Sequence, residues 1–117
     1  MGKRLLVIDD EQMILDSIKI IFEDLGHSVS VSSDPRRGLD VALREDFDLI
    51  LVDIRMPGMN GAEVTAAVHA ARPSARILVI TAHPHDELVT RALEAGAVSV
   101  LRKPFEIARV LDLLKEP

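Results

Sequence analysis

Residues 48–61 read DLILVDIRMPGMNG, and the interpretation of the whole chain starts from this stretch. The apolar run at residues 49–52 is too short for a helix and rich in branched side chains, which predicts a strand buried on both faces. The run ends on a carboxylate, Asp53, and residues 54–61 then form a loop of turn-forming proline, glycine and asparagine. We therefore expect a carboxylate at the mouth of a buried strand, followed by a mobile loop.

Similar patterns recur along the chain and alternate with helical ones. Four further strands are predicted at residues 5–8, 28–32, 77–80 and 98–101. Apolar residues with helical spacing predict five helices, the first ending at Gly26 and the others at about residues 34–45, 63–72, 86–95 and 106–114. Five strands alternating with five helices predict a parallel α/β sheet with helices on both faces.

The composition of the strands predicts their order. The strands at residues 5–8, 49–52 and 77–80 are apolar throughout and should be central, whereas those at 28–32 and 98–101 are mixed and should be edges. The flavodoxin-like order 2-1-3-4-5 of a doubly wound (βα)5 sheet meets both conditions. We expect residues 1–117 to form one domain of this kind.

Two helix faces can also be predicted. In the first helix, the apolar residues should form one inward face made of Ile14, Ile18, Ile21, Phe22 and Leu25. In the fourth, Val89, Ala92 and Leu93 should point inward.

Composition excludes several classes of protein. The chain has 117 residues, a formal net charge of −5 and no cysteine, so disulfides and thiolate metal sites are excluded. No apolar run is long enough to span a bilayer and no signal-peptide pattern is present, so a cytoplasmic protein with no membrane contact is expected. The scattered basic residues and only three aromatic ones argue against direct nucleic-acid binding.

Polar residues follow the predicted strands at the edge where such sheets bind ligands. These residues are Asp9, Asp10, Asp53, Thr81 and Lys103. Three carboxylates in one crevice repel one another unless a cation joins them, and an all-oxygen, partly hydrated site suits Mg²⁺. The lysine can balance a carboxylate or hold a phosphoryl oxygen, and the threonine can donate a hydrogen bond to the same group. This set fits a carboxylate nucleophile that accepts a phosphoryl group.

Four motifs, LLVIDDE, ILVDIRMPGMNG, VITAH and LRKPF, stand in an order and spacing that resemble the receiver domain of two-component response regulators, the CheY-like superfamily. The resemblance covers residues 5–114. It implies a signalling domain whose only catalysis is its own phosphorylation and dephosphorylation. The phosphoryl donor would be a phosphohistidine on a sensor histidine kinase or phosphotransfer protein.

The resemblance also implies a role for each matching residue. Asp53 would be the phosphoacceptor, and Thr81 and Lys103 would contact the phosphoryl group. Mg²⁺ would be held by Asp9, Asp10, Asp53 and the backbone carbonyl of Arg55. A cis peptide is expected before Pro104.

One position departs from the family pattern. Three residues before the lysine, receivers often carry an aromatic ring that turns inward when the threonine moves, but this chain has Val100. A branched aliphatic side chain has few rotamers and little reach, so we expect the signal to leave through the loop that begins at Ala82 and the helix from Asp86. The family's usual interaction surface, made by the fourth helix, last strand and last helix, leaves a homodimer as one option.

Arg55 and His83 occupy positions that tune phosphoryl lifetime in the family. For each of them, an exposed polar side chain with no role stays equally open.

Other functions fit the sequence less well. A haloacid-dehalogenase phosphohydrolase needs a second aspartate where this chain has Arg55, and the acidic residues 9–11 would repel the phosphate of a flavin. No P-loop is present. The alternative that stays open is a pseudo-receiver that binds partners without phosphorylation, although such proteins usually lack an acidic or lysine position that is present here.

Overall fold

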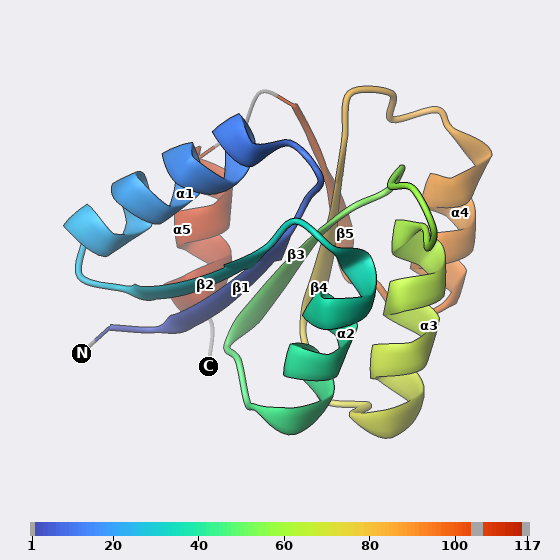
Figure 1. Cartoon of the computed structure of the whole chain (residues 1–117), viewed down its shortest axis with the longest axis horizontal. Coiled ribbons are helices and arrows are strands. Elements are labelled where there is room, and N and C mark those ends of the chain that lie inside the picture. The colour runs from blue at the N-terminus through green and yellow to red at the C-terminus, as the bar shows by residue number, and fades with distance from the viewer. Residues whose placement is uncertain (1, 104–106, 116–117) are drawn as a thin grey trace.

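The computed structural model describes residues 2–103 and 107–115, which form a five-stranded parallel sheet in the order β2-β1-β3-β4-β5 (Figure 1). The predicted fold and strand order are confirmed. In chain order the elements are β1 (Arg4–Ile8), α1 (Gln12–Asp24), β2 (Ser28–Ser32), α2 (Pro35–Arg44), β3 (Leu49–Asp53), α3 (Gly61–Ala71), β4 (Ile77–Thr81), α4 (Glu87–Glu94), β5 (Ser99–Arg102) and α5 (Ile107–Lys115).

Helices cover both faces of the sheet (Figure 1). Helices α1 and α5 lie on one face, where Phe22 and Val110 pack against strand residues such as Leu5. Helices α2, α3 and α4 lie on the other face, where Ala42 and α3 residues pack against Leu6 and its neighbours. Successive residues of β1, β3 and β4 therefore point into different cores, which is why these strands read as continuous apolar runs.

Polar caps fix the starts of three helices. Asp34 accepts a hydrogen bond from the amide of Arg36 at the start of α2, and Asp86 accepts one from Leu88 at the start of α4. Asn60 and Glu63 form a reciprocal capping box at the start of α3. Because each of these helices follows the carboxyl end of a strand, the caps also hold the loops at that edge of the sheet.

The predicted inward face of α1 is partly wrong. Ile18 and Phe22 are buried as expected, but Ile21 is 37% exposed and Leu25 is 54% exposed, and Leu15 is buried instead. A helix lying on a sheet buries only a stripe, and at 100° per residue Ile21 falls on its flank, whereas Leu25 follows the last residue of α1 as its C-cap. In α4 the same effect exposes Leu93 and buries Leu88.

One predicted feature lies outside the described residues, namely the cis peptide before Pro104. Among the helices that the structure describes, none combines the length and the apolar character needed to cross a bilayer.

Candidate functional site

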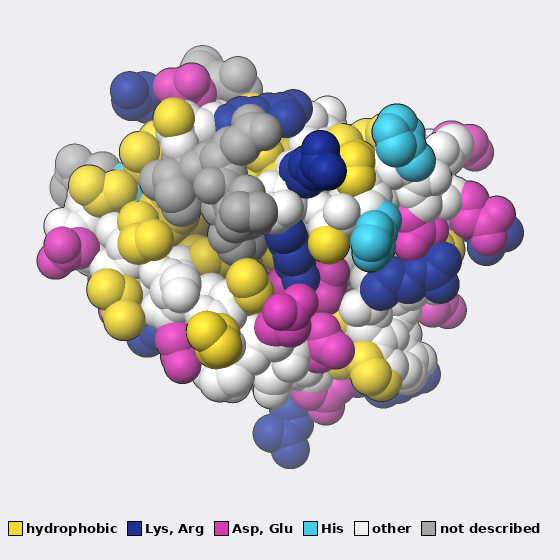
Figure 2. All heavy atoms as spheres, turned by 90° about the horizontal axis from the view of Figure 1, so that it is seen from above, with side chains coloured by type: hydrophobic (Ala, Val, Ile, Leu, Met, Phe, Trp, Pro, Cys, Tyr) yellow, Lys and Arg dark blue, Asp and Glu magenta, His cyan; other side chains and the backbone are white. Residues whose placement is uncertain are grey.

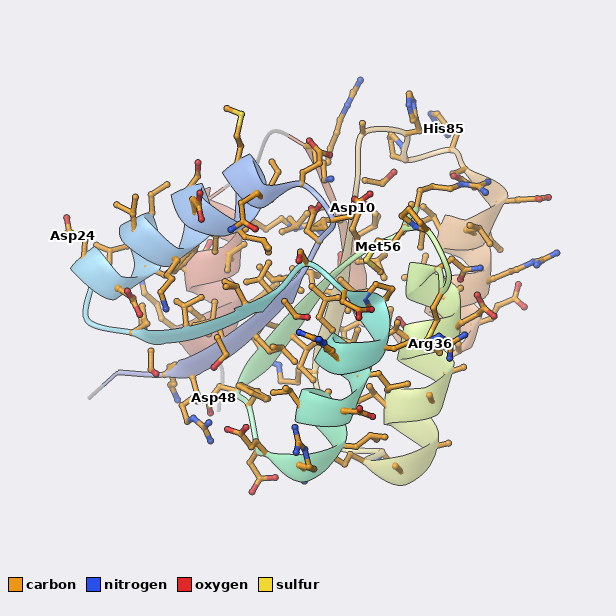
Figure 3. The ribbon with its side chains drawn as sticks, viewed as in Figure 1. Asp10, Asp24, Arg36, Asp48, Met56 and His85 are labelled. Carbon is orange, nitrogen blue, oxygen red and sulfur yellow. The ribbon has the colours of Figure 1, made fainter. Side chains whose placement is uncertain are left out.

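Most of the predicted site residues line a cleft at the carboxyl ends of β1, β3, β4 and β5, and Asp9 lies next to Asp10 and Asp53. Seen from this end, acidic side chains gather near the middle of the surface beside basic ones (Figure 2). Figure 3 places Asp10 at this end and Asp48 at the opposite end. The cleft has a volume of about 240 Å³ and is lined by Asp10, Glu11, Asp53, Ile54, Arg55, Thr81, Ala82, His83 and Lys103.

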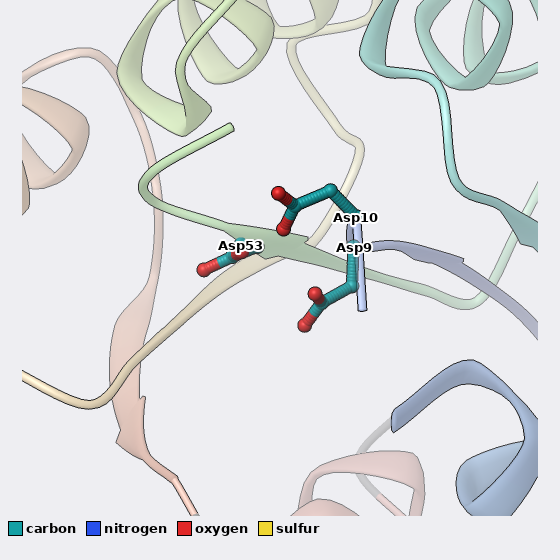
Figure 4. Close-up of side chains that lie close together, drawn as sticks. All are labelled: Asp9, Asp10 and Asp53. Carbon is teal, nitrogen blue, oxygen red and sulfur yellow. The ribbon is translucent and has the colours of Figure 1, made fainter. Parts of the chain in front are cut away.

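Three carboxylates form the acidic cluster (Figure 4). Asp9, Asp10 and Asp53 each offer an oxygen atom within 4.8 Å of the others. Asp9 and Asp53 are buried, whereas Asp10 is exposed. The backbone register explains the grouping, because β1 and β3 are adjacent parallel strands and Ile8 pairs with Val52, so their next residues end the strands side by side.

Lys103 balances part of this charge. Its Nζ lies 2.9 Å from Asp9 Oδ2, 2.9 Å from Glu11 Oε1 and 3.4 Å from Asp53 Oδ1. Its backbone amide donates to the carbonyl of Thr81 at 2.8 Å, which fixes the lysine just beyond β5. One ammonium group thus faces several carboxylates.

Burial changes the acidity of the cluster. Burial, together with the negative charge of Asp9, raises the pKa of Asp53 to about 7, although Lys103 opposes the shift. Burial likewise raises the pKa of Asp9. For Lys103, burial alone would lower the pKa, but its contacts with Glu11 and Asp9 outweigh burial and raise it. Burial therefore favours the protonated form of both buried aspartates, and Lys103 opposes this only in part.

A hard cation fits this arrangement. Asp9 Oδ1 accepts a hydrogen bond from the amide of Glu11 at 2.9 Å, but Asp9 Oδ2 is buried and has no hydrogen-bond donor among the described residues. Its contact with Lys103 is close but lacks hydrogen-bond geometry. A buried carboxylate oxygen without a hydrogen-bond donor, beside two further carboxylates, could hold a hard divalent cation such as Mg²⁺.

Thr81 lies at the end of β4, next to β3. Its side chain is buried, and its Oγ1 accepts a hydrogen bond from the amide of His83 at 2.9 Å. The adjacent amide of Ile54 donates to the carbonyl of Ile80 at 3.0 Å, which ties the loop after Asp53 to β4. Ala82 and His83 are exposed residues of the cleft lining.

Val100 lies on β5, where it pairs with Val79. Its partly buried side chain packs against an aliphatic cluster that includes Leu88, Val89 and Ala92 of α4. At the position where the family often has a ring, this chain therefore has an aliphatic side chain packed against that cluster.

Two residues of the site were not singled out from the sequence. Glu11 pairs with Lys103, and the only signal for it was a third acidic residue next to Asp9 and Asp10. Asp86 pairs with Arg55, 31 residues away, and no sequence pattern pointed to that contact. The sequence did predict that Asp86 begins a helix.

A second hollow, of about 330 Å³, lies between the carboxyl-terminal ends of α2 and α3. Its lining includes Phe47, Ile50 and Arg72 but none of the predicted site residues. The chemistry-bearing side chains are gathered in the smaller cleft.

A doubly wound five-stranded sheet with a cluster of carboxylates and a lysine at the carboxyl edge is the arrangement expected of a receiver domain. The family described as "response regulator receiver domain" matches residues 5–115, and the chain belongs to this family of signalling domains.

Particular relatives support this membership. The chain is 31% identical over 117 residues to chemotaxis protein CheY of Thermotoga maritima, covering 99% of this chain and 98% of that protein. It is 36% identical over 111 residues to a response regulator receiver protein of Anaeromyxobacter sp. (strain Fw109-5), covering 95% of this chain but 47% of that protein. The chain thus spans about half the length of some curated relatives that it matches.

Solved structures support the same family membership. A CheY-like receiver domain protein from Methanospirillum hungatei JF-1 superposes with a TM-score of 0.90 at 34% identity, covering 98% of this chain and 92% of that one. The receiver domain of a sensor histidine kinase from Pseudomonas aeruginosa PAO1, with a magnesium ion coordinated in its active site cleft, has a TM-score of 0.87 at 26% identity, covering 98% and 96%.

Proposed function

We propose that this receiver domain is a phosphorylation-dependent switch that accepts a phosphoryl group on Asp53 from a phosphohistidine of a sensor histidine kinase or phosphotransfer protein. The observation that carries the proposal is the buried Asp53 carboxylate, which faces Lys103 in an open cleft beside two further aspartates. Membership of the receiver family supports the same reading.

In the proposed reaction an Asp53 oxygen attacks the phosphorus atom of the donor. The new O–P bond forms as the N–P bond to the donor imidazole breaks, and the imidazole leaves with the bonding electrons. Asp53 must be ionised to act as the nucleophile, which its raised pKa opposes. Mg²⁺, held by Asp9, Asp10, Asp53 and the backbone carbonyl of Arg55, would supply positive charge that favours the ionised carboxylate and the transferred phosphoryl oxygens.

Lys103 and Thr81 are proposed to contact the transferred group. Lys103 Nζ already lies 3.4 Å from Asp53 Oδ1, so its ammonium group can bind a phosphoryl oxygen attached there. The Thr81 hydroxyl accepts a hydrogen bond from His83 in the resting state. Turning toward the phosphoryl group to donate to it would release that amide and loosen the loop that leads to α4.

The output would use the face formed by α4, β5 and α5, through which a partner or a second copy of the chain would bind. With Val100 in place of a ring, the proposed route to this face runs through Ala82, His83 and α4. We propose a cytoplasmic domain that does not itself bind nucleic acid.

The test is a mass measurement after incubation with acetyl phosphate and Mg²⁺. The account predicts a gain of one phosphoryl group that is absent with EDTA and absent in Asp53→Ala. If the wild type gains no mass, or if Asp53→Ala gains it too, the phosphoacceptor assignment is wrong. Partner binding that persists without any mass gain would favour the pseudo-receiver.

A further inference from the structure

The side chain of Arg55 makes a two-point contact across the rim of the cleft. Its Nε donates to Asp86 Oδ2 at 2.7 Å, and its Nη2 donates to Asp86 Oδ1 at 2.9 Å. Paired, parallel hydrogen bonds of this kind between a guanidinium and a carboxylate are stronger and more directional than a single ion contact. The contact joins the β3–α3 loop, two residues after Asp53, to the residue that begins α4.

Asp86 binds Arg55 and caps α4 at the same time. It is the N-cap of α4, and its Oδ1 also accepts a hydrogen bond from the amide of Leu88 at 3.0 Å. The hydrogen bond from Arg55, followed by the one from Leu88, holds the pKa of Asp86 below its usual value. Because the Asp86 side chain is only 10% exposed, Arg55 fixes a carboxylate that is already packed against the start of the helix.

The loop between Thr81 and α4 is therefore held at both ends. At one end the amide of His83 donates to Thr81 Oγ1, and within the loop the amide of Asp86 donates to the carbonyl of His83 at 3.0 Å. At the other end Asp86 is bound by Arg55. This chain of contacts connects Thr81 to a helix start that is tied back to the loop carrying Asp53.

The geometry also assigns Arg55 an indirect role. Two of its guanidinium nitrogens, Nε and Nη2, donate to Asp86. In the resting state this forked pair of donors therefore points at the N-cap of α4. If Arg55 acted only by attracting phosphate through its positive charge, its guanidinium would not need to point at Asp86.

We propose that Arg55 and Asp86 form a latch that holds the first turn of α4 against the β3–α3 loop in the unphosphorylated protein. Arg55 is then a positioning residue for α4. The proposal rests on the proposed function, because the latch sets how far α4 responds when Asp53 carries a phosphoryl group. Release of the latch gives the signal a route to α4 that needs no aromatic ring on β5.

Amide hydrogen exchange of the unphosphorylated protein tests the latch directly. In Asp86→Asn, the asparagine keeps an oxygen that can cap the helix but loses the charge, and Arg55→Ala removes the fork. Both variants should exchange the α4 amides roughly fivefold faster than the wild type, the factor expected for loss of a good surface ion pair. Arg55→Lys, which keeps the charge without the fork, should lie between them and the wild type.

Arg37→Ala is the matched control. Arg37 Nε lies 3.8 Å from Asp34, the N-cap of α2, so this pair also joins an arginine to a capping aspartate but does so within one helix. Its loss should leave exchange in α4 unchanged. The double variant Arg55→Ala/Asp86→Asn should exchange no faster than either single one, since both remove the same contact.

Unchanged α4 exchange in Asp86→Asn and Arg55→Ala, or effects that multiply in the double variant, would overturn the latch. This arm needs no phosphoryl group and is independent of the proposed function.

A second arm adds beryllofluoride, a phosphoryl mimic, with Mg²⁺. The wild type should then gain exchange in α4 and Asp86→Asn should gain less, although Asp86→Asn still takes up one phosphoryl group from acetyl phosphate.

An equal gain in both proteins contradicts the latch. Failure of the wild type to take up the phosphoryl group contradicts the proposed function instead.

Discussion

Asp53 is a buried acid whose charge is opposed by its surroundings. Its pKa is raised from the ordinary value of an aspartate to about 7, first by burial and then by Asp9. Between about pH 4 and pH 7 the folded protein therefore holds a proton on Asp53 that the unfolded chain has lost. This difference in protonation contributes to the free energy of unfolding. The contribution is fully present below about pH 4 and is lost as the pH rises through about 7.

Asp53→Asn should remove this loss. In EDTA at pH 8 the variant should be more stable than the wild type by about 1–3 kcal/mol, because a neutral amide replaces a buried carboxylate of similar volume. At pH 5 most of this difference should disappear. Urea unfolding at the two pH values measures it, and a difference that is the same at pH 5 and pH 8 would contradict the assigned acidity.

Mg²⁺ should compete with the proton on Asp53. Because a metal ligand must be ionised, Mg²⁺ should raise the melting temperature by several degrees at pH 8 and by less at pH 5.5, and EDTA should reverse the effect. Thermal unfolding with and without Mg²⁺ measures this directly. An equal rise at both pH values would contradict binding through the cluster.

A matched pair of variants separates metal binding from general charge. Asp10→Asn should weaken the effect of Mg²⁺, whereas Asp24→Asn, which removes an equal charge from the distal end of α1, should leave it unchanged (Figure 3). If the two substitutions weakened the effect of Mg²⁺ equally, Mg²⁺ would be acting by screening the net charge of the protein and not by binding at the cluster.

At the scale of elements, α3 begins directly behind the acceptor. A Cβ atom built on Gly61 would lie 2.5 Å from the backbone oxygen of Asp53 and 2.9 Å from Ile54 Cα. The amide of Gly61 also donates to the carbonyl of Ile54 at 2.9 Å. The start of the helix thus supports the backbone that carries the carboxylate.

Gly61→Ala should consequently disturb the site as well as the fold. Backbone atoms cannot yield as a side chain can, so we expect a loss of roughly 1–3 kcal/mol in unfolding free energy together with weaker Mg²⁺ binding. Gly26→Ala is the control, because Gly26 has a φ of 94°, which alanine disfavours, and it follows the end of α1 that lies far from the acidic cluster. It should lower stability without changing Mg²⁺ affinity, and a parallel loss of affinity in both variants would contradict this role for Gly61.

The elements differ in how well they could be predicted from sequence. The strands at residues 5–8, 49–52 and 77–80 were predictable because burial on both faces leaves an unbroken apolar run. The buried side of α1 was only partly predictable, since Ile21 and Leu25 are as apolar as the residues that it buries. The exposure of Ile21 depends on how far the helix is rotated about its axis, and that of Leu25 on where the helix ends; both are decided by packing.

At the scale of the molecule, the proposed output depends on the region between Thr81 and β5. Val100 packs against the aliphatic cluster to which Leu88, Val89 and Ala92 of α4 belong, so we expect a change in the loop to spread through α4. Beryllofluoride with Mg²⁺ should therefore change amide exchange and chemical shifts across residues 82–95 more than in α2. Equal exchange and equal shifts in the free and mimic-bound forms would contradict this route.

Long-range contacts mark the limit of prediction for the site. Asp9, Asp10, Asp53, Thr81 and Lys103 could be placed together because parallel strands bring their carboxyl ends to one edge. The pairing of Lys103 with Glu11 joins residues 92 apart, and that of Arg55 with Asp86 depends on how two loops approach each other. Side-chain partners of this kind follow from the final packing.

The central claim is that Asp53 is the residue that takes the phosphoryl group. Borohydride reduction after incubation with acetyl phosphate and Mg²⁺ converts an aspartyl phosphate to homoserine, and peptide mass spectrometry then locates it. The account predicts homoserine at position 53 alone, dependent on both Mg²⁺ and acetyl phosphate. Homoserine at Asp9 or Asp10 instead, or at no aspartate, would contradict it.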